Sequence, residues 1–200
     1  MKGIYAILDE SNFNFSSLEK SVEYMIKYNI KIFQIRIKSS FTKKNISIIK
    51  KIKFLCKNHK CLLILNDNVD LANELELDGV HVGSGDADIS SVRSTLGENK
   101  IIGVSCYNDI NLALSSEKLG ASYVSFGSLY KTTTKLNPIN LDISTVKNAS
   151  KILKIPICLI GGINTNNVHD VIKLNCDLIA ISKGLSSNNE IEDISKIYYE

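Results

Sequence analysis

Eight short apolar runs alternate with eight longer amphipathic segments along the whole chain. Each run is mostly branched or aromatic and nearly continuous, as expected for parallel strands that helices cover. We predict strands at Ile4–Leu8, Ile32–Ile37, Cys61–Leu65, Gly79–Val82, Ile101–Ser105, Tyr123–Phe126, Ile157–Ile160 and Leu178–Ile181. Eight strand–helix units within 200 residues predict an α/β fold, a single-domain (β/α)8 TIM barrel over residues 1–200.

The segments between these runs have the period of amphipathic helices. In the segment 45–56, for example, Ile48, Ile49 and Ile52 share one stripe, with lysines opposite. We predict helices at Ser17–Tyr28, Thr42–Asn58, Val69–Glu76, Ile89–Leu96, Ile110–Leu119, Ile143–Lys151, Thr165–Leu174 and Glu190–Tyr198. The runner-up fold is an open doubly wound sheet, but no glycine-rich dinucleotide turn follows the first strand.

Composition places the chain among ordinary globular proteins, with 44% hydrophobic and 22% charged residues. The formal net charge of +3 is too small to indicate nucleic acid or a membrane surface as a partner. The five cysteines form no CxxC pair and three lie in apolar runs, so we expect buried thiols in a reducing compartment. No signal peptide or membrane-spanning run is evident, which predicts a cytoplasmic protein. A homo-oligomer is compatible with the sequence.

In a barrel of this kind, the chemistry lies at the carboxyl ends of the strands. Gln34, Arg36 and Lys38 alternate with isoleucines, so the period of two points all three toward one face. Because helices cover the outer face, we expect this face to be the barrel interior. Two cations there require an anionic partner, which is either a bound ligand or an internal ion-pair network.

Two acidic residues follow neighbouring strands at the same rim. Asp67 follows Asn66 at the end of the third strand, and Asp86 follows the fourth. Oxygen ligands beside phosphate-binding cations are typical of Mg²⁺ that substrate phosphates hold in part, so we predict Mg²⁺ at Asp67 and Asp86. Each aspartate has the alternative role of a loop or helix cap. His81, inside the fourth strand, fits a hydrogen-bonded barrel histidine better than a base.

Further polar tips follow the later strands. The sixth strand runs into a loop in which Thr132, Thr134 and Lys135 offer donors and a point charge to an oxyanion. Glycine-rich tips follow the seventh and eighth strands, at Gly162 and beside Ser182, which is the usual phosphate site of this architecture.

These tips group into two anion regions. The first fits a diphosphate and consists of Arg36, Lys38, Asn66, Asp67, Asp86 and Lys135. The second carries few charges, fits a monophosphate and consists of Thr132, Thr134, Gly162 and Ser182. The sequence offers no strong nucleophile, Ser-His-Asp set or thiolate site. A diphosphate leaving group without a protein nucleophile indicates ionisation followed by transfer to a second substrate.

Six short motifs follow one another in the order of the predicted strands. They are Gln34–Lys38, Asn66–Asp67, Asp78–Gly83 with Asp86, Gly103–Ser105, Thr132–Lys135 and Ile160–Ile163. In these motifs, and along nearly its full length, the chain resembles the thiamine phosphate synthase (thiamine-phosphate pyrophosphorylase) family. The resemblance implies a transferase that joins 4-amino-2-methyl-5-hydroxymethylpyrimidine diphosphate to 4-methyl-5-(hydroxyethyl)thiazole phosphate. The products would be thiamine phosphate and pyrophosphate, and the partners would be small-molecule substrates alone.

The resemblance also implies roles for single residues. The pyrimidine diphosphate would be held by Gln34, Arg36, Lys38, Asn66 and Lys135. Mg²⁺ would be bound by Asp67 and Asp86, and the pyrophosphate would be contacted by Ser105. The thiazole phosphate would be received by Thr132, Thr134, Gly162, Ser182 and Lys183. The implied mechanism is dissociative, with the catalytic residues stabilising the departing pyrophosphate: Arg36, Lys38, Ser105 and Lys135.

The chain departs from the family pattern at four positions. Asn68 stands where the family usually has arginine, Ser84 where it has glutamine, Tyr107 where it commonly has histidine and Lys131 where it has proline. Two alternatives follow. One is an isomerase like the thiazole tautomerases, which share the barrel but rely on a histidine at the position of Tyr107. The other is a barrel that binds phosphorylated thiazole without turnover. Mg²⁺-dependent release of pyrophosphate separates the transferase from both.

Overall fold

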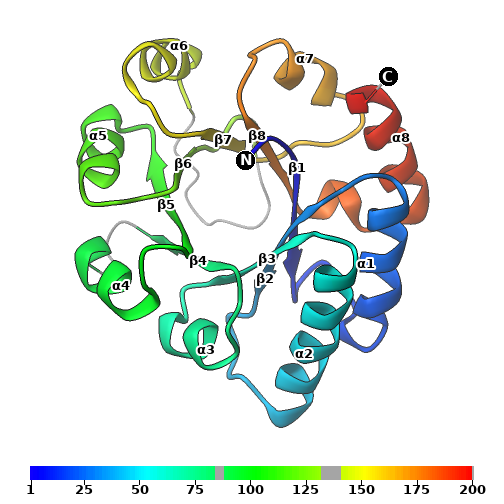
Figure 1. Ribbon diagram of the computed structural model, residues 1–200. Helices are drawn as coiled ribbons and strands as arrows, with labels where there is room; N and C mark the ends of the chain where they lie inside the picture. Colours follow the sequence, from blue (N-terminus) through cyan, green and yellow to red (C-terminus); the bar gives the residue numbers. More distant parts are fainter. Residues whose placement is uncertain (84–87, 132–140, 200) are drawn as a thin grey trace.

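Eight parallel strands close into a barrel in the order β1 to β8 (Figure 1). The structure is a computed structural model, and it describes residues 1–83, 88–131 and 141–199. The strands are β1 Gly3–Asp9, β2 Ile32–Arg36, β3 Leu62–Asn66, β4 Gly79–Gly83, β5 Ile101–Tyr107, β6 Tyr123–Phe126, β7 Ile157–Ile160 and β8 Leu178–Ile181. Each pairs in parallel with the next, and β8 pairs with β1. The predicted TIM barrel is confirmed.

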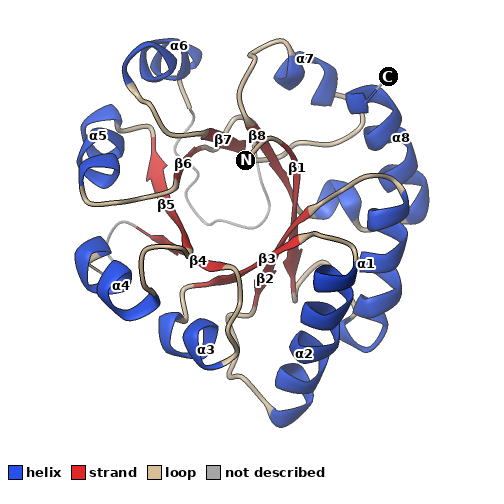
Figure 2. Cartoon of the chain, in the orientation of Figure 1, coloured by secondary structure: helices blue, strands red, loops and turns tan. Residues whose placement is uncertain are grey.

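A helix follows each strand and lies outside the barrel, so the helices form a ring around the strands (Figure 2). They are α1 Leu18–Lys27, α2 Lys43–Asn58, α3 Val69–Glu74, α4 Ile89–Leu96, α5 Ile110–Lys118, α6 Ile143–Ile152, α7 Val168–Ile172 and α8 Asn188–Tyr199. Every predicted helix is present, with small differences at the ends. Two short 3-10 helices were not predicted, η1 Phe15–Ser17 and η2 Lys183–Leu185.

The largest difference from the predicted helices is at α7, which was expected to begin at Thr165 and begins at Val168. Side-chain amides explain the later start. The Asn164 carboxamide accepts from the Asn166 N–H at 2.9 Å, and the Asn167 carboxamide accepts from the Asn164 N–H at 2.9 Å. These local bonds hold a turn in place of the first helical turn.

Two apolar layers hold the fold together. The outer layer packs strand residues such as Phe33, Leu63 and Val80 against the helices. The inner layer fills the barrel and consists of Tyr5, Ile7, Ile32, Ile64, Tyr123, Cys158, Leu178 and Ala180. Because these side chains occupy the interior, the barrel is a packed core rather than a pore.

All five cysteines are free thiols, and four of them are buried: Cys56, Cys61, Cys106 and Cys158. The prediction that they act as small buried hydrophobic side chains therefore fits the structure. In the described part of the chain, no helix is both long enough and apolar enough to cross a membrane.

Arg93, on α4, forms hydrogen bonds to two loops at the amino-terminal ends of the strands. Its guanidinium donates to the carbonyl oxygens of Gly97 at 2.9 Å, Lys100 at 2.6 Å and Gly120 at 2.7 Å. The first two carbonyls precede β5 and the third precedes β6. One side chain therefore satisfies carbonyl groups on both connections.

We expect Arg93→Met to lower the free energy of unfolding by about 2 kcal/mol, because several partly buried carbonyls lose a charged donor. The corresponding fall in melting temperature is about 6 °C. Lys118→Met, which removes the same charge from an exposed position at the end of α5, is the control. Chemical denaturation of both variants measures the difference, and equal stability would contradict this role for Arg93.

Candidate active site

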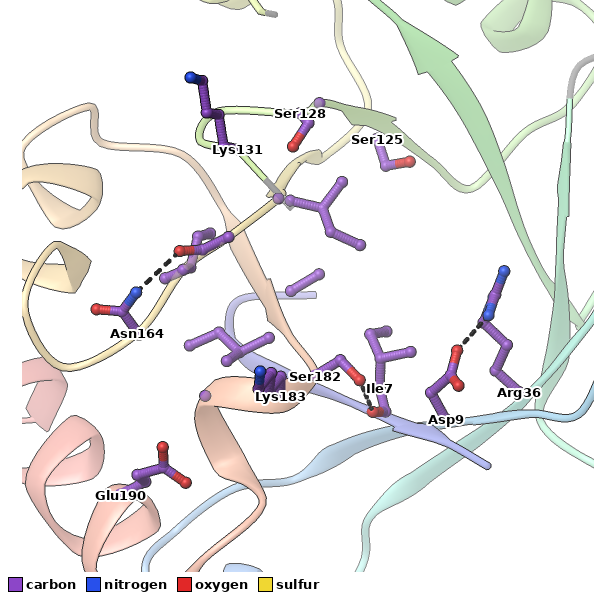
Figure 3. Close-up of a pocket in the computed structure, with 18 of the residues that line it drawn as sticks. Ile7, Asp9, Arg36, Ser125, Ser128, Lys131, Asn164, Ser182, Lys183 and Glu190 are labelled. Carbon is purple, nitrogen blue, oxygen red and sulfur yellow. Dashed lines mark hydrogen bonds and ion pairs between the residues drawn. The ribbon is translucent and has the colours of Figure 1, made fainter. Parts of the chain in front are cut away.

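A cavity of about 500 Å³ opens at the carboxyl ends of the strands (Figure 3). Its walls come from the ends of β1, β2 and β5 and from the loops after β6, β7 and β8. The polar residues that line it include Asp9, Arg36, Ser105, Ser125, Ser128, Lys131, Asn164, Ser182, Lys183 and Glu190. It therefore occupies the end of the barrel at which the sequence predicted chemistry.

Arg36, at the end of β2, forms an ion pair with Asp9, at the end of β1 (Figure 3). The Asp9 carboxylate also accepts from the Ser11 N–H at 2.9 Å and from the Ser11 hydroxyl at 2.5 Å. Burial alone would raise the pKa of Asp9, but the bonds from Ser11 and the Arg36 guanidinium together hold this pKa below its ordinary value. Asp9 is therefore ionised at neutral pH and fixes the direction of Arg36.

Lys38 and Asp67 form a second ion pair at the mouth, with Nζ and Oδ2 2.5 Å apart. Lys38 follows the end of β2 and its side chain is 54% exposed, whereas Gln34 is buried and Arg36 lines the cavity. Asp67 has a left-handed backbone, with φ of 63°. Both cations have carboxylate partners, as the alternative of an internal ion-pair network expected. Their roles toward a ligand stay predictions.

Gln34, His81 and Ser105 belong to a chain of hydrogen bonds beneath the cavity. Gln34 is 3% exposed and donates to the Tyr5 hydroxyl at 2.7 Å. The His81 ring nitrogens lie 2.8 Å from the Tyr123 hydroxyl and 2.9 Å from the Ser105 hydroxyl. His81 is thus the hydrogen-bonded barrel histidine that the sequence indicated.

The loops after β7 and β8 bring Gly162 and Ser182 into the lining of the same cavity. Gly162 has a φ of 63°, and a Cβ at this position would lie 2.7 Å from the Lys131 carbonyl oxygen, so only glycine fits. The Ser182 hydroxyl donates to the Ile7 carbonyl at 2.9 Å and accepts from the Asn12 amide at 3.0 Å. The Ser182 hydroxyl proton is therefore bonded to the Ile7 carbonyl and is not available to a ligand.

Backbone N–H groups remain available in these loops. The structure gives the N–H groups of Gly162, Ser182 and Lys183 no acceptor among the described residues. The predicted second anion region was expected to carry few charges, yet Lys131 and Lys183 both line the cavity, with Glu190. This side of the cavity therefore offers backbone donors together with two ammonium groups.

Several predicted site residues lie outside the described residues. They are Asp86, Thr132, Thr134 and Lys135. Ser84 and the segment 136–140 lie outside as well. Of the others, the cavity brings together Arg36, Ser105, Gly162, Ser182 and Lys183. Gln34, Lys38, Asn66 and Asp67 surround this group without lining the cavity as the described residues define it.

A family model described as thiamine monophosphate synthase matches residues 4–185. The chain belongs to this family. The thiamine-phosphate synthase of Nitrosomonas eutropha is 36% identical over 196 residues, which are 98% of this chain and 92% of that protein. The thiamine-phosphate synthase of Clostridium acetobutylicum is 34% identical over 197 residues, covering 98% and 93%. The solved thiamine phosphate pyrophosphorylase of Pyrococcus furiosus has a TM-score of 0.84 at 29% identity, covering 97% and 94%.

Membership in the thiamine monophosphate synthase family confirms the resemblance inferred from the six motifs. The enzyme class that follows is a transferase, the thiamine-phosphate synthase. Enzymes of this family use Mg²⁺, and their substrates are a pyrimidine and a thiazole phosphate.

Three of the four departures from the family pattern lie among the described residues. Asn68 is the N-cap of α3, where its side chain accepts from the Leu71 N–H at 3.0 Å. This bond satisfies one of the free donors at the start of the helix. Tyr107 ends β5 with a φ of 52° and lines the cavity. Lys131 lines the cavity too, so it adds a cation where the family commonly has proline.

The oxygen donors at the end of β3 suit Mg²⁺. The Asp67 carboxylate holds the Lys38 ammonium, so it lies in position to hold positive charge. Asn66 beside it is 7% exposed and adds an amide oxygen. Among the described residues, no group of three or more potential metal-binding side chains occurs. A metal here would therefore take further oxygens from Asp86 or from a substrate.

Sequence reasoning assigned no separate role to Asp9, Ser125, Ser128 or Asn164, all of which line the cavity. Asp9 could have been found, because it follows the first apolar run directly, just as Asp67 follows the third. The two serines carry no such signal, since short hydroxyl side chains occur throughout the chain. Asn164 reads as a turn residue, and it does donate to the Gly162 carbonyl at 3.1 Å.

Asp9→Asn tests the charge of the ion pair without changing its shape. Because the folded protein lowers the pKa of Asp9, its stabilisation is present above the ordinary carboxyl range and is lost as pH falls through the folded value. We expect the variant to be less stable by about 1 kcal/mol above about pH 5, and we expect this difference to disappear as pH falls through the folded pKa of Asp9.

Denaturation at a series of pH values measures this difference, and exposed Glu74→Gln on α3 is the matched control. If Asp9→Asn were less stable than the parent by the same amount at low and at neutral pH, the loss of stability would come from a change in packing and not from the loss of charge.

Proposed function

We propose that the chain couples 4-amino-2-methyl-5-hydroxymethylpyrimidine diphosphate with 4-methyl-5-(hydroxyethyl)thiazole phosphate, giving thiamine phosphate and pyrophosphate. The observation that supports the proposal is one cavity lined both by Arg36 and by the loops after β7 and β8, in a member of this family. Those loops contain Gly162, Ser182 and Lys183. Two phosphorylated substrates need this arrangement, because their reacting atoms must meet between the two sites.

The diphosphate would bind at the ends of β2 and β3. Arg36 is directed by Asp9 and presents its remaining donors to the cavity. Lys38 is held by Asp67 only in an exposed ion pair, which contributes little, so its ammonium group is free to turn to a diphosphate oxygen. Ser105 supplies a hydroxyl to the same side, and Lys135 is assigned there from the family motif.

Asp67 and Asp86 would hold Mg²⁺, and Asn66 would support the site. When bound, the metal would neutralise charge on the departing pyrophosphate. The protein itself contributes the two cations Arg36 and Lys38 to the same task. Preorganised charges of this kind stabilise a transition state in which negative charge builds on the leaving group.

The thiazole phosphate would bind across the loops after β7 and β8. The N–H groups of Gly162, Ser182 and Lys183 are suited to phosphate oxygens, since glycine lets the anion approach the backbone. Ser182 would contribute through its backbone, because its hydroxyl proton is donated to Ile7. Thr132 and Thr134 are assigned to this phosphate from the family motif.

The proposed reaction is a dissociative transfer. The bond between the pyrimidine methylene carbon and the diphosphate oxygen breaks, and its electron pair leaves with the pyrophosphate. The aminopyrimidine stabilises the resulting cation, and the lone pair of the thiazole nitrogen then forms the new carbon–nitrogen bond. No side chain has to act as nucleophile or base, which agrees with the cavity lining.

The tautomerase alternative receives no support from the cavity. That activity depends on a histidine at the position of Tyr107, and a tyrosine lines the cavity there. A barrel that binds thiazole phosphate without turnover is distinguished by experiment. Purified protein is given both substrates, with and without Mg²⁺, and pyrophosphate and thiamine phosphate are measured. Equal release of both products that requires both substrates and metal supports the proposal, and saturable binding without release contradicts it.

Asp67→Ala should lower turnover by about 100-fold or more, because it removes a charge from a preorganised site. The fold should persist, since the side chain is 33% exposed and bonds mainly to Lys38. Asp70→Ala, which removes an exposed carboxylate three residues away on α3, is the matched control. Steady-state rates at several Mg²⁺ concentrations provide the measurement, and near-normal turnover would refute the role of Asp67.

A further inference from the structure

A continuous chain of hydrogen bonds crosses the barrel interior beneath the cavity. Gln34 Nε2 lies 2.7 Å from the Tyr5 hydroxyl, which lies 2.9 Å from the Tyr123 hydroxyl. The Tyr123 hydroxyl lies 2.8 Å from His81 Nδ1, and His81 Nε2 lies 2.9 Å from Ser105 Oγ. Five strands each contribute one member, and only Ser105 lines the cavity.

The members of the chain are buried and closely packed. Tyr5, Tyr123 and Gln34 are 1%, 0% and 3% exposed, and His81 is 8% exposed. The Tyr123 ring meets Tyr5 edge-on at 5.9 Å and stacks on His81 at 5.6 Å. Gly103 leaves the space for this ring, because a Cβ there would lie 2.1 Å from Tyr123 Cζ. The rings of Tyr5, Tyr123 and His81 are therefore held in place by their packing against one another.

The hydrogen bonds of this chain have a direction, which the Gln34 amide nitrogen sets. This nitrogen can only donate, so the Tyr5 oxygen accepts from it. Burial raises the pKa of both Tyr5 and Tyr123, so each phenol is neutral and carries one proton. If each phenol proton is to have an acceptor within this chain, the Tyr5 proton goes to the Tyr123 oxygen and the Tyr123 proton goes to His81 Nδ1.

The same direction continues to the cavity. With Nδ1 as the acceptor in this arrangement, His81 would carry its proton on Nε2 and donate it to Ser105 Oγ. The Ser105 hydroxyl proton is then left to point away from the histidine, toward the cavity that Ser105 lines.

We propose that Gln34, Tyr5, Tyr123 and His81 are positioning residues that orient the Ser105 hydroxyl as a hydrogen-bond donor to the pyrophosphate group in the cavity. The identity of this anion rests on the proposed function. Gln34 would thus act through the chain of hydrogen bonds rather than by contact with the diphosphate. The chain also strengthens the donor, since each hydrogen bond polarises the next.

The first test is the protonation of His81 in the unliganded parent protein. Histidine is labelled with ¹⁵N, and the ring signals of the three histidines are assigned by single substitution. We expect a neutral His81 with the proton on Nε2 near pH 7. A proton on Nδ1, or on both nitrogens, would overturn the proposal, whether or not the protein is a synthase.

The second test measures binding of inorganic pyrophosphate, with magnesium chloride, by calorimetry. Ser105→Ala should weaken binding about tenfold, the loss of one hydrogen bond to a charged group. Tyr123→Phe keeps the ring but removes the donor to His81, and it should weaken binding about fivefold without touching the ligand. Tyr28→Phe, which removes a phenol between α1 and α8, is the matched control and should change nothing.

The double variant decides between orientation and a general structural effect. If Tyr123 acts through Ser105, Tyr123→Phe should cost nothing further once Ser105 is alanine. A fivefold loss that persists in the Ser105→Ala background would overturn the proposal. Parent protein that binds no pyrophosphate would overturn the proposed function instead, while the His81 tautomer still tests the chain of hydrogen bonds.

Discussion

A closed barrel leaves no solvent on the inner face of its strands, so every polar side chain that points inward must find a partner. Two groups of residues meet this condition at different depths. In the middle of the barrel, Tyr5 and Tyr123 bond to each other and to neutral neighbours. At the mouth, Asp9 and Arg36 bond as an ion pair. The interior thus changes from apolar through neutral polar to charged along its axis, because charge is tolerated only where the cavity admits water or ligand.

Most of the fold could be predicted from the sequence, because the period of apolar residues is a local signal. The eight strands begin and end within a few residues of the predicted ranges. The errors occur where side chains compete with backbone periodicity, as Asn164 does before α7. The site was less predictable. Strand ends such as Arg36 and Asp67 were found, since a rule of position applied to them. The partner of Arg36 is Asp9, which lies 27 residues earlier in the chain. The two residues come together only because β1 and β2 pair in parallel.

The chain of hydrogen bonds through Tyr123 illustrates the limit of sequence reasoning more sharply. Tyr5, Gln34 and His81 each lie within an apolar strand, and nothing local distinguishes them from ordinary core residues. Their relation depends on the radius of the barrel, which places side chains from non-adjacent strands less than 3 Å apart. Gly103 is also required, because the absence of a side chain there leaves the space that the Tyr123 ring occupies. Such pairs across the barrel are properties of the closed structure.

Residues other than glycine with left-handed backbones occur at both ends of the barrel, and Asn29, Lys60, Glu76 and Asn175 have them in the turns before strands at the amino-terminal end. At the amino-terminal end, Arg93 satisfies several carbonyls and serves stability. At the carboxyl end, Asp67 and Tyr107 have left-handed backbones, a conformation that costs free energy in residues other than glycine. Gly162 has the same conformation without this cost. The paired strands beneath the mouth fix the positions of these loops, and they would hold the two proposed anion sites at a fixed separation. A transfer between two phosphorylated substrates needs that separation to be constant, because the cation formed on one of them must meet the nitrogen of the other before water does.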